Sequence, residues 1–154
     1  NTKYNGDFKL EVNETQTELE LAVKAGYFIL HKTGDEIRVL KDINSFVSFI
    51  KRKNRDFSFA QVIRVLDQIA IDVATIFNGT YLGSSNNTSY DRNDLKKDIG
   101  KHHETLEDLR AIRDFNEETD ITVVEGETRE SVLVTTNVRP VVAMEKLYMN
   151  VIVS

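Results

Sequence analysis

The chain has 154 residues, of which 40% are hydrophobic and 29% charged, a balance typical of a folded protein rather than a disordered one. Its net charge of -5, and the lack of an apolar run long enough to cross a bilayer, argue against a nucleic-acid or membrane partner. The chain has no cysteine, which excludes disulfides, thiolate metal sites and a cysteine nucleophile. It begins with Asn1 rather than methionine, and we expect it to be part of a longer polypeptide.

Two short elements are predicted within the first 26 residues. The alternating apolar residues Phe8, Leu10 and Val12 favour a short strand. The following stretch, TQTELELAVKAG, favours a helix, because Thr15 or Thr17 can cap its start, glutamates occupy its first turn and a glycine ends it.

A β-hairpin is predicted next, in the stretch YFILHKTGDEIRVLKDI. Residues 27–32 favour a strand, residues 33–35 a turn, and apolar side chains alternate again from 37 to 43. A basic cluster follows at Lys51, Arg52, Lys53 and Arg55, with phenylalanines on both sides of it. Since the chain is acidic overall, we interpret these phenylalanines as core residues rather than as a surface for single-stranded nucleic acid.

The stretch SFAQVIRVLDQIAIDVATIFNG is the strongest helix candidate. Ser58 and Gln61 have the spacing of a capping box, and an Asn-Gly pair at 78–79 provides a stop. Apolar residues surround most of this helix, so we expect it to be central in the fold. We expect Arg64 and Asp67, which are three positions apart, to form an ion pair.

A second long helix is predicted from about Arg92 to Ile112, after a polar loop that we expect to be exposed and mobile. Gly100 inside this helix costs about 1 kcal/mol relative to alanine. The positions expected to face the core are Leu95, Ile99, His102, Leu106 and Leu109.

The rest of the sequence is typical of strands, in the stretches ITVVEG, SVLVTTNV and VVAMEKLYMNVIVS. Near the end, Leu147, Met149, Val151 and Val153 alternate on one face of a predicted strand. Pro140 cannot donate a ladder hydrogen bond, so it indicates a strand start, an edge or a bend. We therefore predict an α+β fold, in which the β-hairpin and the C-terminal strands form a sheet packed against two long helices.

Residues typical of catalysis are few. His102 and His103 lie beside Glu104 and Glu107, but one helix supplies too few convergent ligands for a metal, and His31 is the only other histidine. The sequence lacks a phosphate-binding loop and a nucleophile elbow. We therefore expect no enzymatic activity, no cofactor and no metal site.

Four stretches together resemble the C-terminal domain of contractile tail sheath proteins. QVIRVLDQIAIDVATIF followed by YLG resembles the central helix of that family, and AMEKLYMNVIV resembles its C-terminal strand. AGYFILHKTGDEIRVLKDINSF and KHHETLEDLRAIRDF lie where the family has its hairpin and its second helix. The resemblance covers most of the chain and is closest to the sheaths of myophages and of R-type bacteriocins of Gram-positive bacteria.

The resemblance implies a structural role. Sheath subunits form stacked rings around a rigid tail tube, and each lends extended arms that add strands to the sheets of its neighbours. On contraction the subunits slide and rotate while the arms keep the lattice connected, and the tube is driven through the target envelope. The implied partners are other copies of the sheath protein, the tube protein, and the baseplate and tail terminator proteins. Assembly is expected in the bacterial cytoplasm, before the phage tail or bacteriocin particle is released.

By this resemblance, residues 1–143 form the tube-facing domain, and residues 144–154 form its arm strand, exchanged between subunits. The arm residues expected at the subunit interface are Lys146, Leu147, Tyr148, Met149, Asn150, Val151, Ile152 and Val153. The hairpin residues expected to receive an arm are Phe28, Ile29, Leu30, Ile37 and Val39. The residues expected to contact the tube are Lys96, Lys97 and Lys101, with the basic cluster at 51–55 as a rival.

Two other functions stay open from the sequence. One is a non-viral interaction module that captures a partner's strand and has no enzymatic activity, and the other is a metal-dependent enzyme using His102 and His103. The terminal strand also has an ordinary alternative, which is to pair within the sheet of its own domain. The resemblance favours exchange, because an apolar strand edge that promotes polymerisation serves a protein built to assemble.

Overall fold

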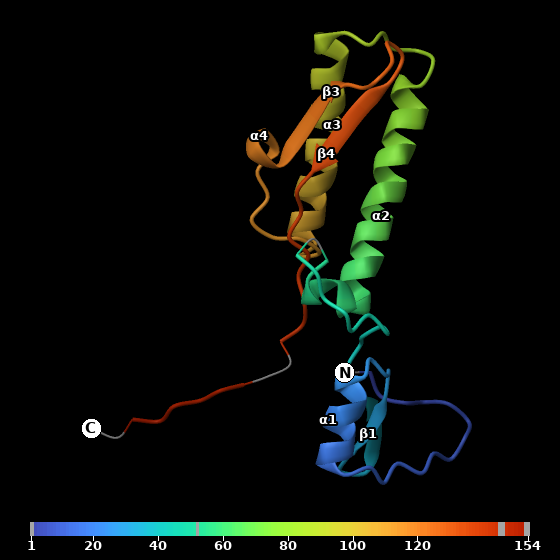
Figure 1. Ribbon diagram of the computed structural model, residues 1–154, viewed down its shortest axis with the longest axis vertical. Helices are drawn as coiled ribbons and strands as arrows, with labels where there is room; N and C mark the ends of the chain where they lie inside the picture. Colours follow the sequence, from blue (N-terminus) through green and yellow to red (C-terminus); the bar gives the residue numbers. More distant parts are fainter. Residues whose placement is uncertain (1, 52, 145–146, 153–154) are drawn as a thin grey trace. The chain divides into compact units, whose positions relative to one another are not determined.

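The computed structural model describes residues 2–51, 53–144 and 147–152, and the chain forms two compact units, residues 1–64 and 65–154 (Figure 1). The predicted α+β class is confirmed, since helices and antiparallel strands occur together. The strands form two separate two-stranded sheets, β1–β2 in the first unit and β3–β4 in the second, where the sequence pattern indicated one sheet.

Helix α1 (Gln16–Lys24) begins where the sequence predicts. Thr15 is its N-cap and forms a capping box: the Thr15 hydroxyl accepts from the Glu18 amide, and the Glu18 carboxylate accepts from the Thr15 amide at 2.8 Å. These hydrogen bonds from Thr15 lower the pKa of Glu18. The helix ends at Lys24, and Gly26, just after the Ala25 C-cap, has a φ of +82°, the left-handed conformation that glycine adopts at little cost.

The predicted hairpin is confirmed but is shorter, with β1 at Leu30–Thr33 and β2 at Glu36–Val39. Residues 2–4 lie along the outer edge of β2, where the Tyr4 amide donates to the Ile37 carbonyl and the Val39 amide to the Thr2 carbonyl. The predicted strand at residues 8–12 is wrong, and Phe8 is 80% exposed. The alternating pattern of residues 8–12 does not specify a strand for them to pair with. Residues 2–4 lie instead along the edge of β2, whose backbone groups were free to form hydrogen bonds.

Helix α2 (Ala60–Ile76) follows a 3-10 turn, η1 (Arg55–Ser58), and continues into a π-helical turn, η2 (Phe77–Tyr81). The predicted Ser58 cap is wrong, because the Ser58 hydroxyl donates instead to the Arg55 carbonyl within η1. The Asn-Gly pair does not stop the helix, since η2 runs through it and ends at Leu82. The helix is also less central than predicted, because Ile71 is 60% exposed.

The ion pair predicted between Arg64 and Asp67 is also wrong. The Arg64 guanidinium pairs instead with the Asp42 carboxylate, which lies 22 positions earlier in the sequence. Local spacing on a helix indicates which residues share a face, but here an acid from another segment is the better placed partner.

Helix α3 (Ser89–Asp108) begins and ends earlier than predicted, because Thr88 caps its first turn and Leu109 its last. Leu95 and Ile99 are buried as expected, whereas Leu109 is 72% exposed. A short helix, α4 (Glu117–Asp120), follows. A Cβ on residue 100 would lie 2.6 Å from Oε2 of Glu117 in α4, so a larger residue than Gly100 in the middle of α3 would require the Glu117 side chain to move.

Strands β3 (Ile121–Glu125) and β4 (Val132–Thr136) form the second hairpin, paired from Ile121 and Thr136 to Glu125 and Val132. Figure 1 shows this hairpin lying along α3, with α2 beside it. The core of the second unit is formed by Leu95, Ile99 and Ile121. Partly buried side chains of α2, η2 and β4 close around these three, namely Val73, Ile76, Phe77, Tyr81, Val132 and Val134.

Candidate assembly surface

The chain leaves the second unit through an anchored segment, residues 137–141, which we call the arm root. Antiparallel to it lie residues 111–113, with the Arg113 amide donating to the Arg139 carbonyl and the Val141 amide to the Ala111 carbonyl. Ile112, which is 1% exposed, bridges Pro140 here, at an edge position that needs no amide donor from the proline.

Hydrogen bonds to charged side chains also hold the arm root in place. The Arg139 guanidinium donates to the Asp114 carbonyl at 2.8 Å and to the Asp120 carboxylate at 3.3 Å. The Asn116 amide donates to the same carboxylate, and this bond, with the Arg139 contact, lowers the pKa of Asp120. The chain is therefore held firmly up to Val141.

Beyond the root, the described part of the predicted arm, residue 144 and residues 147–152, is exposed and has no regular secondary structure. Its apolar side chains are uncovered on both faces: Met144, Leu147, Tyr148, Met149, Val151 and Ile152 are all at least 74% exposed. Asn150 is exposed too, while Lys146 and Val153 lie outside the described residues. Among the described residues, no strand of this domain pairs with the arm.

The predicted receiving hairpin offers one strand edge. Residues 2–4 already pair with the outer edge of β2, whereas no described residue pairs with the outer edge of β1. Phe28, just before β1, is 56% exposed, and the other predicted residues, Ile29, Leu30, Ile37 and Val39, are half-buried. The second hairpin also has apolar side chains at the surface, with Val124 43% and Leu133 57% exposed.

The predicted tube-contacting lysines all lie on α3, and each has a partner. Lys97 contacts Asp94 at 3.5 Å, Lys101 contacts Asp98 at 3.4 Å, and the Lys96 ammonium reaches the Glu118 carbonyl at 3.5 Å. Since exposed pairs of this length contribute little to stability, these lysines stay available for a partner's acidic groups.

One residue of the basic cluster at 51–55, Arg55, lines a small cavity of the first unit, about 300 Å³ in volume. Arg55 lines this cavity together with Lys24 and with Phe46 and Phe49, whose rings meet edge-on at 5.7 Å. Phe49 is 50% exposed, so the expectation that these phenylalanines are core residues is only partly confirmed. Arg52 lies outside the described residues.

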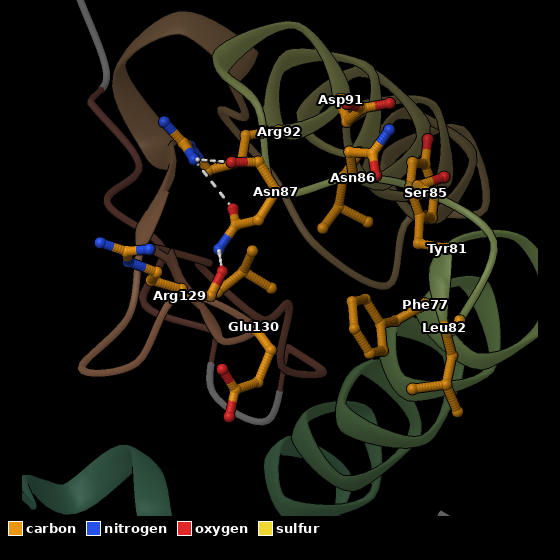
Figure 2. A pocket seen from close by; sticks show the side chains of 13 residues that line it. Phe77, Tyr81, Leu82, Ser85, Asn86, Asn87, Asp91, Arg92, Arg129 and Glu130 are labelled. Atoms are coloured by element: carbon orange, nitrogen blue, oxygen red, sulfur yellow. Dashed lines mark hydrogen bonds between the residues drawn. The ribbon is translucent and has the colours of Figure 1, made fainter.

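A larger cavity, about 460 Å³, lies in the second unit between η2, the start of α3 and the turn of the second hairpin (Figure 2). The Arg92 guanidinium donates to the carbonyl and the side-chain oxygen of Asn87, whose amide donates to the carbonyls of Arg129 and Ser131. Figure 2 shows Phe77 across the cavity from these groups. The loop predicted to be exposed and mobile thus joins three elements, which its polar composition did not indicate.

The two adjacent histidines lie side by side on α3, in the second unit. His103, not the predicted His102, is the fully buried ring. Across the residues placed in the structure, no group of three or more histidine, aspartate or glutamate side chains is arranged to hold a metal ion. Nor does any helix there combine the length and the apolar character needed to span a membrane.

Comparison with known proteins identifies the class. The family model of the phage tail sheath C-terminal domain matches residues 52–154. The match covers more than half of the chain, and it includes α2, α3, both strands of the second hairpin and the arm. The chain therefore belongs to the phage tail sheath family, and the predicted family is confirmed.

Particular relatives agree with this assignment. The chain is 36% identical over 121 residues to the phage-like element PBSX protein XkdK of Bacillus subtilis, and equally to the protein YqbK of the same organism. Each alignment covers 75% of this chain and 26% of the relative. The chain thus spans about a quarter of the length of these curated relatives.

Two solved structures share the fold. The sheath tail protein of Desulfitobacterium hafniense is 33% identical, with a TM-score of 0.76 over 88% of this chain and 31% of that one. The sheath tail protein of Listeria innocua gives a TM-score of 0.74 over 88% of this chain and 33% of that one. Its identity of 24% supports the likeness of fold alone.

Proposed function

We propose that this chain is the C-terminal part of a structural subunit of a contractile tail sheath. In this proposal, copies of the protein assemble around a tail tube in the bacterial cytoplasm, contact the baseplate and terminator proteins at the two ends, and contract to drive the tube through the target envelope. Membership of the sheath family supports the structural role, and the role requires no catalytic residue.

The observation that carries the proposal is the contrast between the arm root and the arm. The root is fixed by hydrogen bonds as far as Val141, and six large apolar side chains in the described part of the arm are exposed. Exposed apolar side chains with unpaired backbone groups are the features that strand addition to a partner's sheet uses. The arm is therefore proposed to order on a neighbouring subunit.

Two strand edges compete to receive the arm. The outer edge of β1, in the predicted receiving hairpin, is open, but β1 lies before the residues that the family model matches. The edges of the β3–β4 hairpin lie within the matched residues. We retain β1 as the proposed receiver and treat the second hairpin as the rival in the experiment below.

Residues 1–154 contain no cysteine, so the receiving edge can be identified by disulfide trapping once any cysteine elsewhere in the full-length protein has been replaced by serine. Full-length protein carrying Met149→Cys is mixed with full-length protein carrying Lys32→Cys, assembled, and oxidised. A covalent dimer is expected only from assembled protein, and Leu133→Cys in place of Lys32→Cys serves as the matched probe of the second hairpin. If dimers form with Leu133→Cys but not with Lys32→Cys, the arm is received by the second hairpin. If dimers form with neither variant, strand addition at both hairpins is excluded.

Deletion of residues 146–154 tests the assembly role itself. We expect the full-length variant to lose sheath formation in electron micrographs while its thermal unfolding stays unchanged, because the side chains of residues 147–152 are exposed. Replacement of the same residues by a Gly-Ser segment of equal length is the control for chain length. Normal sheaths from the deleted protein would contradict the proposal.

For tube contact we propose Lys96, Lys97 and Lys101 on α3, facing acidic groups of the tube. Reversing the charge at Lys96 and Lys97 is expected to reduce co-assembly of sheath and tube, and more so at low salt, where electrostatic attraction acts over longer distances. The matched variant is charge reversal at Lys51 and Lys53, in the rival cluster. Unchanged co-assembly of the first variant would exclude these α3 lysines.

A further inference from the structure

We propose that Asp72, His102, His103 and Thr136 form a partly buried proton site that accommodates one extra proton on its two imidazoles but not two, so that a second proton releases β4 from the helices. This inference concerns the second unit alone and goes beyond the assembly role. It rests on geometry that joins three elements of that unit, α2, α3 and β4 (Figure 1).

The four side chains form a continuous row of hydrogen-bonding groups. Asp72 Oδ2 lies 2.9 Å from His102 Nε2, the two Nδ1 atoms of His102 and His103 are 3.3 Å apart, and His103 Nε2 lies 3.0 Å from Thr136 Oγ1. The other oxygen of Asp72 accepts from the Gln68 amide at 2.8 Å. Every ring nitrogen in the row therefore has a defined neighbour.

The inner end of the row is sealed from water. His103 has no exposed surface, and its ring packs against Phe115 with the centroids 5.2 Å apart. The side chains of His102 and Asp72 are 18% and 31% exposed, so protons enter from their side.

Proton counting allows a neutral state. The Asp72 carboxylate only accepts, so His102 Nε2 carries a proton and its Nδ1 is an acceptor when the ring is neutral. His103 then donates from Nδ1 and accepts at Nε2 from the Thr136 hydroxyl. Every ring nitrogen of the row is satisfied.

One added proton is also accommodated. If His102 takes it on Nδ1, that atom becomes a donor toward His103, whose own proton must then lie on Nε2 and be donated to Thr136 Oγ1. The charge rests beside the Asp72 carboxylate, whose pKa the His102 hydrogen bond lowers. Protonation of His102 thus changes the tautomer of His103 and turns the Thr136 hydroxyl.

A second proton has no place. Both Nδ1 atoms would carry hydrogens that face each other at 3.3 Å, and two cationic rings would lie with centroids 5.4 Å apart. Asp72 already serves His102, and Glu107, one turn further along α3, has its carboxylate accepting from the Phe115 amide at 3.1 Å. Thr136 and Phe115 supply no negative charge. Burial and the neighbouring His102 lower the pKa of His103, and they outweigh a hydrogen bond to the Ile99 backbone that favours the charged ring.

The consequence is a loss of packing in acid. A histidine whose pKa is lower in the folded state stabilises the fold fully above its unfolded pKa of about 6.5, and this stabilisation falls as the pH drops below that value. Thr136 is the last residue of β4 and directly precedes the arm root. Releasing it loosens the segment from which the arm extends.

Nitrogen NMR of the imidazoles tests the row directly in the intact chain. When the row takes up its first proton, we expect His103 to exchange an Nδ1 proton for an Nε2 proton, and we expect His103 not to be cationic while the second unit is folded. Thr136→Val removes the hydroxyl next to His103 Nε2 and is expected to change the ratio of the two His103 tautomers. Thr135→Val, at an exposed site of the same strand, is expected to leave this ratio unaltered. A folded state with both rings charged, or a His103 tautomer that ignores His102, would overturn the proposal.

Denaturant unfolding gives a second readout. From pH 7.5 to 5.5, the unfolding equilibrium constant of the natural sequence is expected to rise by up to about tenfold more than that of His103→Gln, the limit set by one proton. His31→Gln is the control, because His31 also contacts a threonine hydroxyl, Thr33 Oγ1 at 3.2 Å, but has no second imidazole beside it. Equal pH dependence in the natural sequence and His103→Gln would overturn the proposal. If His103→Gln does not fold, the tautomer shift in Thr136→Val decides it.

Discussion

Strand β4 and the arm have similar sequences and opposite surroundings. VLVTT at 132–136 and LYMNVI at 147–152 are both rich in the β-branched, aromatic and other apolar residues that are typical of strands. In β4, Val132 and Val134 pack on the core of the second unit, whereas the apolar side chains of the arm are exposed. Strand propensity is therefore shared by the two segments, and burial is not.

The difference follows from what each segment can reach. β4 meets β3 across a short turn, closed by a hydrogen bond from the Gly126 amide to the Ser131 carbonyl, so little chain entropy is lost in pairing. The arm follows a root that is itself tied to residues 111–113, and within the described residues no strand edge lies against it. A segment with strand character and no partner in its own domain is one that a neighbouring molecule can order.

The largest effect is expected in the core beneath the β3–β4 hairpin. Ile99 has no exposed surface and packs with Leu95 and Ile121, so Ile99→Ala should lower the free energy of unfolding by about 2–5 kcal/mol, measured by denaturant titration. Leu109→Ala, at the exposed end of the same helix, is the control and should change it by less than about 0.5 kcal/mol. Similar costs at the two sites would mean that the core is placed wrongly.

A smaller effect is expected where η2 is tied to α3. The Tyr81 hydroxyl donates to the Asp98 carboxylate at 2.7 Å, which raises the pKa of Tyr81 together with burial and lowers that of Asp98. Tyr81→Phe should cost about 1–2 kcal/mol, because a bond to a charged acceptor is lost. Tyr90→Phe, on a side chain 74% exposed, is the matched control. In Tyr81→Phe the Asp98 pKa should move back toward its ordinary value, and carbon NMR of the carboxyl measures that.

The smallest effect on the free chain is expected in the arm, and this sharpens the contrast with β4. Met149→Ser should change the free energy of unfolding by less than about 0.5 kcal/mol, since the side chain is 74% exposed, whereas Val134→Ser in β4 should be clearly destabilising. In assembly, by contrast, Met149→Ser should have a clear effect and weaken sheath formation. A destabilised free chain in Met149→Ser would show that the arm packs on its own subunit.

Local signals in the sequence were sufficient where the partner is local. The Thr15 cap, the first hairpin and the buried positions Leu95 and Ile99 were predicted because caps, turns and helical periodicity act within a few residues. The Ser58 cap failed since Ser58 belongs to a preceding 3-10 turn that periodicity does not reveal.

Predictions that depend on distant partners were less successful. The Arg64 partner comes from residue 42, and the burial of His103 rather than His102 depends on where Phe115 and Thr136 lie. The strand expected at residues 8–12 and the single sheet failed for the same reason, because alternation does not specify which edge a strand meets. The arm residues were named from their alternation and from family resemblance, and their pairing stays a prediction.

The most direct test of the central proposal is the position of residues 147–152 in an electron cryomicroscopy map of the assembled full-length protein. We expect this segment to be extended and hydrogen-bonded along a strand edge of a neighbouring subunit, with Leu147, Met149 and Val151 buried on one face. A map in which the same residues pair with a strand of their own subunit would contradict the account.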